Sequence, residues 1–484
     1  MNFKKQYLII LLAALILGFA GAYAGVKLAQ PHQDKQDGEM SFGLSSSSDG
    51  EKAEKPEDMD KVVQAFNLIK KNYLEDVKDK DLIDGAVKGM LNTLDDPYST
   101  YMDVETMKNF NETIESSFEG IGAEVSMVNG KVTIIAPIKD SPAEDAGLRP
   151  NDQIVKIDDE SVEGLELYEA VEKIRGEKGS KVTLNVQRPG VSDPFDVTLK
   201  RDEIPVETVN SEVEKVDGKK TGVLEITTFS EHTAEEFTEQ LLKLEKQGIE
   251  GLVIDVRGNP GGLLDAVEDI LKQFITKDMP YVQIEDQNGE KTPYYSDLKQ
   301  KKDYPISVIV DEGSASASEI LAVAMKEAGY DIVGTKSFGK GTVQQAVPMG
   351  DGSTIKLTFY KWLSPKGNWI HEKGIKPTIK VKQPAYFYSN PVEIKKPLTY
   401  NHTGDNVKNI QIMLTGLDYD TGRQDGYFSK QTKEAVKAFQ QDNDLKATGQ
   451  VDKKTGEMIE TEIVEHIRDG NDDLQMQKAL NELY

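Results

Sequence analysis

The sequence contains no cysteine and only five histidines among its 484 residues. The absence of cysteine excludes thiol catalysis, disulfides and cysteine–metal sites, and it suits an exported protein that needs no oxidative folding. No spacing resembles a metal site, so we predict no metal. A Ser–His–Asp triad could use only the second or third histidine, because the first lies in a polar linker and the last two lie outside the expected core. The histidines are His32, His232, His371, His402 and His466.

Basic residues are outnumbered by acidic ones, 58 to 83, and the formal net charge is −25. This balance argues against nucleic acid, and against an anionic lipid surface, as the partner of the folded part. The turn Arg257-Gly-Asn-Pro-Gly-Gly262 follows a strand as a phosphate loop would, but it lacks the G-K-[ST] ending. We therefore expect no nucleotide and no other cofactor.

One long uncharged apolar run, residues 6–26, follows Lys4 and Lys5. At about 1.5 Å per residue a helix of this length spans roughly 30 Å of hydrocarbon, and the two lysines would keep the N-terminus in the cytoplasm. The segment Ala22-Tyr-Ala24 also fits a signal-peptidase site. We interpret residues 1–29 as a membrane anchor rather than a cleaved signal peptide, and the polar residues 30–57 as a flexible tether.

Residues 58–116 show two apolar stripes with helical spacing, which predict a helical region. From 117 to 190 the pattern is β-rich, with a Gly120-Ile-Gly-Ala123 loop before an extended run. Residues 191–384 alternate strands and helices, which predicts an α/β core with the β-rich module inserted ahead of it. A connector follows over 385–399, then a small three-helix module over 400–460 and a charged, solvated terminal helix over 461–484.

The densest chemical signal lies between Pro305 and Ala346. Apolar residues at 306–310 predict a buried strand, and those from Ile320 onward predict a helix, so Ser316 falls at a helix N-terminus. A hydroxyl there can face solvent beside free backbone N–H groups that stabilise a negative oxygen. Ser316 and Glu319 also fit S-x-x-E, a helix capping box, which is the competing structural interpretation.

A lysine flanked by glycines follows in Phe338-Gly-Lys-Gly-Thr-Val-Gln344. In an extended chain Lys340, Thr342 and Gln344 share one face. A lysine among apolar neighbours has a lowered pKa and can act as general base toward a serine. The pattern predicts a Ser–Lys dyad with Ser316 as the nucleophile, although spacing alone cannot bring the two segments together.

These two motifs, Ser314-Ala-Ser-Ala-Ser-Glu319 and Phe338 to Gln344, resemble the paired signature of the carboxyl-terminal processing (tail-specific) proteases. The resemblance implies that Ser316 is the nucleophile, Lys340 the base and Gln344 its support. It also implies that the N–H groups of Gly261 and Ala317 bind the oxyanion. We interpret Asp255, at the end of the preceding strand, as a structural carboxylate rather than a triad member. Ser316 and Lys340 lie about one residue closer together than in relatives, a difference that the loop near Gly329 can absorb.

The flanking modules carry resemblances of their own. Residues 117–190 resemble a PDZ domain, which implies that Gly120, Ile121, Gly122 and Ala123 hold the terminal carboxylate of a peptide that adds as a strand. Arg175, a C-terminal helix cation in the simplest interpretation, contacts the protease body in some relatives and is a candidate regulatory site. Residues 400–460 resemble a peptidoglycan-binding module, with a plain dimer-contact domain as the alternative. The family often dimerises through its N-terminal helical region.

Two function classes remain open at this point. The first is an extracytoplasmic serine endopeptidase, anchored by one transmembrane helix or secreted if that segment is cleaved. It would form a homodimer, recognise exposed apolar C-termini of proteins through the PDZ domain, and react through an acyl-enzyme. The second is a non-catalytic scaffold that uses the PDZ and wall-binding modules to collect exported proteins.

Overall fold

A computed structural model describes residues 58–484 except 129, 166 and 471. The predicted anchor and tether, residues 1–57, lie outside this range. Among the helices that are described, none combines the length and the apolar character that crossing a bilayer requires.

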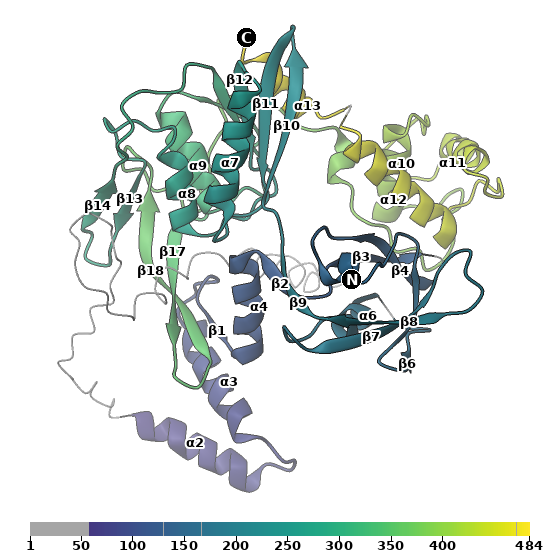
Figure 1. Cartoon of the computed structure of the whole chain (residues 1–484), viewed down its shortest axis with the longest axis horizontal. Helices are drawn as coiled ribbons and strands as arrows, with labels where there is room; N and C mark the ends of the chain where they lie inside the picture. Colours follow the sequence, from purple (N-terminus) through teal and green to yellow (C-terminus); the bar gives the residue numbers. More distant parts are fainter. Residues whose placement is uncertain (1–57, 129, 166, 471) are drawn as a thin grey trace.

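The described part of the chain starts with a helical arm. Helix α2 (Met59–Asn72) has no buried residue, and α3 (Asp79–Asn92) buries only Leu91. Figure 1 shows both helices extending away from the body of the molecule. Strand β1 (Thr100–Met102) and α4 (Val104–Glu115) then join the arm to the protease core, because β1 pairs with a core strand. The apolar stripe of α2 is therefore real but faces solvent in the single chain.

The β-rich module is an antiparallel sheet with its own apolar core. Its strands pair in the order β3-β4-β5-β7-β8, with β6 beside β5, and α5 and α6 accompany them. A two-stranded ribbon of β2 and β9 connects it to the rest of the chain. The elements are β2 (Ser117–Gly120), β3 (Ala123–Val128), β4 (Lys131–Pro137), α5 (Pro142–Asp145), β5 (Gln153–Ile157), β6 (Glu160–Ser161), α6 (Leu167–Ile174), β7 (Lys181–Gln187), β8 (Phe195–Lys200) and β9 (Asp202–Pro205).

The α/β core contains two sheets. The first has the order β10-β11-β12-β15-β16-β19 and is parallel except for the β10–β11 pair. The second has the order β1-β18-β13-β14, with β17 paired to β18. The elements are β10 (Val209–Val216), β11 (Lys219–Ile226), α7 (Thr233–Lys246), β12 (Gly251–Asp255), α8 (Leu264–Leu271), β13 (Val282–Glu285), β14 (Lys291–Tyr294), β15 (Ile306–Val310), α9 (Ala317–Glu327), β16 (Asp331–Gly334), β17 (Thr342–Pro348), β18 (Thr354–Leu363) and β19 (Ile379–Lys380).

Alternation along the strands decides what covers each face of the first sheet. Successive side chains of a strand point to opposite faces. Leu252, Ile254 and Val308 belong to the cluster that α7, α8 and α9 cover, whereas Val253 and Ile309 belong to a second cluster on the other face. Both faces are therefore buried, as expected for a mostly parallel sheet.

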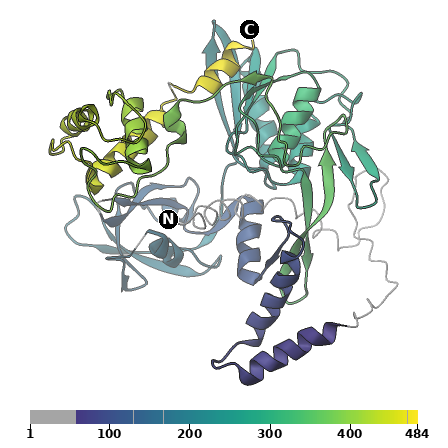
Figure 2. The ribbon, with the colours of Figure 1, turned by 180° about the vertical axis from the view of Figure 1, so that it is seen from behind.

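The C-terminal helices form a separate small core and then return to the protease. Helices α10 (Asp405–Gly416), α11 (Lys430–Asp442) and α12 (Lys453–Arg468) pack together with the connector, which contains the short 3-10 helix η2 (Ala385–Tyr388). The expectation of one solvated helix over 461–484 is wrong. Helix α12 continues to Arg468, and a separate α13 (Leu474–Asn481) covers the second face of the sheet, with Ala479 fully buried (Figure 2).

Candidate active site

Ser316 lies in the connection between β15 and α9, directly before the first residue of α9, as the sequence predicts. Its φ is 52° and its ψ −113°, a conformation that L-residues rarely adopt and that costs roughly 1–3 kcal/mol. The N–H groups of Ser318, Glu319 and Ile320 donate to carbonyl oxygens of Ala315 and Ser316. In the described part of the chain the N–H of Ala317 has no acceptor, which leaves it available at the helix N-terminus.

The carboxylate of Glu319 joins the serine motif to the lysine motif. One oxygen accepts the N–H groups of Ser316 at 3.0 Å and Lys340 at 2.7 Å. The other accepts the N–H of Gly339 at 2.8 Å and the hydroxyl of Ser337 at 2.6 Å. Glu319 is fully buried, and burial raises its pKa while these hydrogen bonds oppose the rise. The local S-x-x-E pattern predicted a contact between Glu319 and Ser316 but missed the larger role.

Lys340 is buried beside an aromatic ring. Its side chain is almost inaccessible, and its Nζ lies 5.1 Å from the ring centre of Tyr98. Burial lowers the pKa of Lys340 to about 8, although the charges of Asp96 and Glu319 act in the opposite direction. Within the described residues no hydrogen bond joins Lys340 Nζ to Ser316 Oγ. The structure thus brings the two motifs together and places a lysine with a lowered pKa there, with its amine turned toward Tyr98.

Gln344 is buried on β17, two residues beyond Thr342. Its Nε2 donates to the hydroxyls of Thr342 at 2.9 Å and Thr358 at 3.0 Å. Its Oε1 is buried and has no hydrogen-bond partner among the described residues. A buried acceptor without a partner is costly, so this oxygen is available for a donor that arrives during function.

A second buried lysine belongs to the site and was missed by the sequence analysis. Lys356 of β18 is 2% exposed, and its Nζ lies 5.9 Å from the ring centre of Phe110. Burial and the charge of Lys340 lower its pKa to about 7, while Asp96 raises it. Its strand reads Thr354-Ile-Lys-Leu-Thr358, in which a lysine on the polar side of an alternating strand gives no signal of burial.

The expected oxyanion turn packs against the nucleophile but is partly occupied. A Cβ on Gly261 would lie 2.7 Å from Ser316 Cβ and 2.9 Å from the nitrogen of Ala317, so only glycine fits there. The N–H of Gly261, however, donates to Oδ1 of Asn259 at 2.8 Å. This N–H is therefore engaged by Asn259 in the structure, a residue that sequence reasoning overlooked, and its binding of the oxyanion stays a prediction.

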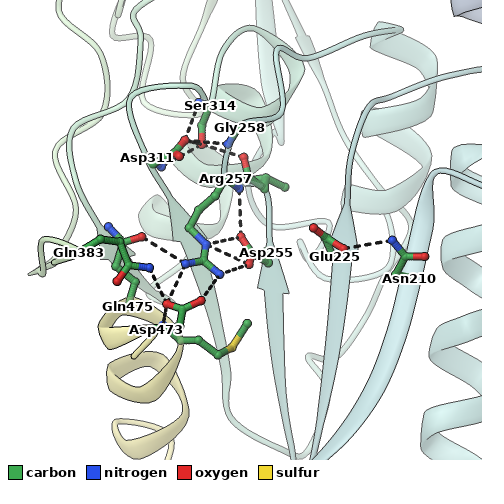
Figure 3. Close-up of polar contacts among 12 residues, drawn as sticks. Asn210, Glu225, Asp255, Arg257, Gly258, Asp311, Ser314, Gln383, Asp473 and Gln475 are labelled. Atoms are coloured by element: carbon green, nitrogen blue, oxygen red, sulfur yellow. Dashed lines mark hydrogen bonds and ion pairs between the residues drawn. The ribbon is translucent and has the colours of Figure 1, made fainter. Parts of the chain in front are cut away.

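Asp255 is a structural carboxylate, consistent with the sequence interpretation. It pairs with the guanidinium of Arg257 at 2.6 Å, and Asp473, at the start of α13, pairs with the same guanidinium at 2.8 Å (Figure 3). The neighbouring N–H of Gly258 donates to Asp311 at 2.8 Å. These contacts connect the C-terminal helix with the turn that leads to Gly261.

Neither candidate histidine is placed as a base. Nδ1 of His371 accepts the N–H of Gly341 at 3.2 Å, and its ring stacks on Trp369 with centroids 5.0 Å apart. His232 is largely exposed, beside Glu235. A cleft of about 720 Å³ lies beside His371, lined by aromatic, threonine and acidic side chains that include Tyr98, Thr342, Thr358, Trp369 and Glu372.

The glycine loop of the β-rich module uses its carbonyl oxygens in hydrogen bonds within the module. The carbonyl oxygen of Gly122 accepts the N–H of Ile138 and the hydroxyl of Ser141, both at 2.8 Å, and that of Ile121 accepts the N–H of Ala143 at 2.8 Å. The N–H groups of Ile121 and Gly122 have no acceptor among the described residues. Two adjacent free N–H groups form a concavity suited to an anion such as a terminal carboxylate.

Arg175 contacts the N-terminal helical region. Its guanidinium lies 3.7 Å from the carboxylate of Glu112 on α4 and 5.0 Å from the ring centre of Phe118. The side chain is nearly half exposed, so the ion pair adds little stability. The structure thus places Arg175 at the junction of the β-rich module and α4, which leads through β1 into the site.

Models of four known families match the chain: "Peptidase family S41" over residues 220–381, "Activating protease CtpB N-terminal domain" over 15–106, "PDZ domain" over 133–188 and "Putative peptidoglycan binding domain" over 403–459. Together they account for most of the folded chain, and they support the predicted combination of modules.

Curated relatives are similar along the whole chain. The carboxy-terminal processing protease CtpB of Bacillus subtilis is 53% identical over 99% of both chains. CtpA of the same organism is 43% identical over 91% of this chain and 92% of its own length. A solved photosystem II D1 C-terminal processing protease is 26% identical, with a TM-score of 0.41, over 68% of this chain and 94% of that one. The protein is a serine-type peptidase and belongs to the carboxy-terminal processing proteases of peptidase family S41.

Proposed function

We propose that this protease cleaves through a Ser316–Lys340 dyad with Gln344 as the support of the lysine, and that it forms an acyl-enzyme. One observation carries the proposal: a single buried oxygen of Glu319 accepts the N–H groups of both Ser316 and Lys340. The two segments, which are separate in sequence, are thereby held at one place in the core. Within that place burial lowers the pKa of Lys340 to about 8, which increases the share of neutral amine relative to an ordinary lysine.

The chemistry needs the neutral amine to turn from Tyr98 toward Ser316. Nζ takes the hydroxyl proton as Ser316 Oγ attacks the scissile carbonyl carbon. The N–H of Ala317 stabilises the oxyanion, and the N–H of Gly261 joins it if Asn259 releases it. The C–N bond then breaks, and Nζ returns the proton to the leaving amine. Water, deprotonated by the same amine, hydrolyses the ester to release the acid and regenerate Ser316.

The PDZ domain supplies recognition of free C-termini in this proposal. The N–H groups of Ile121 and Gly122 would bind the terminal carboxylate, and the peptide would add as a strand beside β3. Arg175 would sense occupancy of the domain, and two contacts support this: Arg175 contacts Glu112 on α4, and α4 packs next to the second sheet of the core. A peptide with an amidated C-terminus should therefore be cleaved more slowly than its free-acid counterpart.

The location and assembly complete the proposal. Residues 1–29 would anchor the protein with residues 58–484 outside the cytoplasm, residues 30–57 would act as the tether, and the module over 400–460 would contact peptidoglycan. The exposed apolar side chains of α2 and α3 would pair with those of a second copy, since such patches mark interaction sites. They include Val62, Val63, Leu68, Ile69, Ile83 and Met90. N-terminal sequencing of the protein in the membrane fraction tests the anchor, and sedimentation with cell walls tests the contact with peptidoglycan. Light scattering of a Leu68→Glu variant tests the pairing of two copies.

The central experiment uses mass spectrometry of fragments released from a defined peptide with an apolar free C-terminus. Ser316→Ala and Lys340→Met should each abolish cleavage. Ser307→Ala is the matched control, because Ser307 on β15 is buried and its hydroxyl has no hydrogen-bond partner among the described residues. It should cleave at the wild-type rate. Cleavage at the same bond by a folded Ser316→Ala protein would overturn the proposal.

A further inference from the structure

The orientation of the Gln344 amide is determined by a chain of hydrogen bonds that begins outside the protease core. Gln344 Nε2 donates to Oγ1 of Thr358 at 3.0 Å, and Thr358 Oγ1 donates to Oδ2 of Asp96 at 2.7 Å. Asp96 lies in the loop before β1, which also carries Tyr98. This loop therefore contacts Gln344 through one threonine hydroxyl.

The carboxylate sets the direction of the whole chain. An ionised carboxylate only accepts hydrogen bonds, so the single hydroxyl proton of Thr358 must point to Asp96. The hydroxyl oxygen can then only accept from Gln344, and the amide must turn its NH₂ group toward Thr358. Its oxygen, Oε1, is left as the buried atom without a partner. If the amide were turned the other way, its Oε1 would face the hydroxyl oxygen of Thr358. Two acceptors would then meet with no proton between them, because the hydroxyl proton of Thr358 is donated to Asp96.

Two bonds within the loop hold Asp96 in this position. Its Oδ1 accepts the N–H of Tyr98 at 3.0 Å, and its Oδ2 accepts the hydroxyl of Ser99 at 2.6 Å. The hydroxyl of Ser99 in turn accepts the N–H of Thr358 at 3.1 Å. The loop and β18 are thus connected twice, once through the backbone and once through the side chain of Thr358.

The orientation matters for the lone pair of Lys340. A neutral amine that donates one of its hydrogens to Gln344 Oε1 keeps its lone pair for the hydroxyl proton of Ser316. An amide turned the other way would present NH₂, which would bind that lone pair instead. We propose that Asp96 and Thr358 are positioning residues that keep Oε1 of Gln344 as the acceptor for the Lys340 amine. The inference rests on the proposed Ser316–Lys340 mechanism.

The test compares Thr358→Val with Thr358→Ser in the full chain. The valine variant keeps the shape but removes the hydroxyl, and the serine variant keeps the hydroxyl. We expect the valine variant to lose about tenfold in kcat with KM within twofold of wild type, as the loss of one hydrogen bond at the reacting group allows. The serine variant should restore kcat to within twofold. Thr335→Val is the matched control, because the buried hydroxyl of Thr335 has no partner in the described chain.

Asp96→Asn tests the direction rather than the presence of the bond. An asparagine amide can donate to Thr358, whose hydroxyl is then free to donate to Oε1 of Gln344. Its kcat should therefore also fall about tenfold. The assay is run at pH 9, where Lys340, whose pKa is about 8, is mostly unprotonated.

The outcomes separate this inference from the proposed function. Full activity in Ser316→Ala would remove the mechanism and the inference together. Inactive Ser316→Ala combined with wild-type kcat in Thr358→Val, or with a serine variant no better than valine, would overturn the inference alone. The inference would also be overturned if Thr358→Val lost both kcat and thermal stability and Thr358→Ser restored neither, because Thr358 would then be only a packing residue.

Discussion

The lowered pKa of Lys340 leads to a defined dependence of activity on pH. Burial lowers this pKa from 10.5 to about 8. At pH 7 the neutral fraction of the amine is then about one in eleven, against roughly three in ten thousand for an ordinary lysine. Burial thus raises the amount of functional base about 300-fold at pH 7.

The expected profile follows from the sign of this change. The neutral amine is lost as the pH falls through the pKa, so kcat/KM should be level above pH 9. It should drop roughly fiftyfold between pH 8 and pH 6. The assay is cleavage of a quenched fluorescent peptide with a free apolar C-terminus, at constant ionic strength. Lys340→Arg supplies the control, because a guanidinium stays charged throughout this range and should give no turnover.

The neighbouring lysine provides the strongest challenge to this assignment. The pKa of Lys356 is lowered to about 7 by burial and by the charge of Lys340. If Lys340 is the base, kcat/KM of Lys356→Met should still fall as the pH is lowered. If kcat/KM of Lys356→Met no longer fell at low pH, and Lys340→Met still turned over substrate, the base would be Lys356. A wild-type profile that is flat between pH 6 and pH 9 would refute the reasoning for both.

Three further perturbations test the supporting structure. The two carboxylate oxygens of Glu319 accept four hydrogen bonds, and Glu319→Gln keeps only one of these oxygens. The loss of two hydrogen bonds should lower the free energy of unfolding by roughly 3 kcal/mol. An unchanged denaturant midpoint would contradict this expectation. Gly122→Ala places a Cβ 2.4 Å from a neighbouring side chain and should abolish binding of a fluorescent free-acid peptide, whereas Gly130→Ala, at a similar φ in open space, should bind normally. Asp473→Asn weakens the pairing of Arg257 and should lower stability on the order of 1–3 kcal/mol, so a wild-type melting temperature would argue against a role for α13 in holding the oxyanion turn.

The sequence alone was sufficient for features that depend on local pattern. Apolar residues at 306–310 and from Ile320 onward predicted β15 and α9, and the break between them placed Ser316 at a helix N-terminus. The glycines around Lys340 and the loop Gly120–Ala123 were recognisable because their backbone requirements are local. The family was correctly identified from the same short motifs.

Only the tertiary structure decided how these motifs act on one another. Glu319 connects Ser316 to Lys340, and Asp96 contacts Gln344 through Thr358. Helix α13 covers one face of the sheet, although its charged sequence predicted a solvated helix. Each contact joins segments that are distant in the chain, and hydrophobic periodicity reports only which side of an element is buried, not which partner covers it. Ser316 and Lys340 can therefore be proposed as the dyad from sequence, but the contacts that hold their segments together and set the pKa of Lys340 arise from packing.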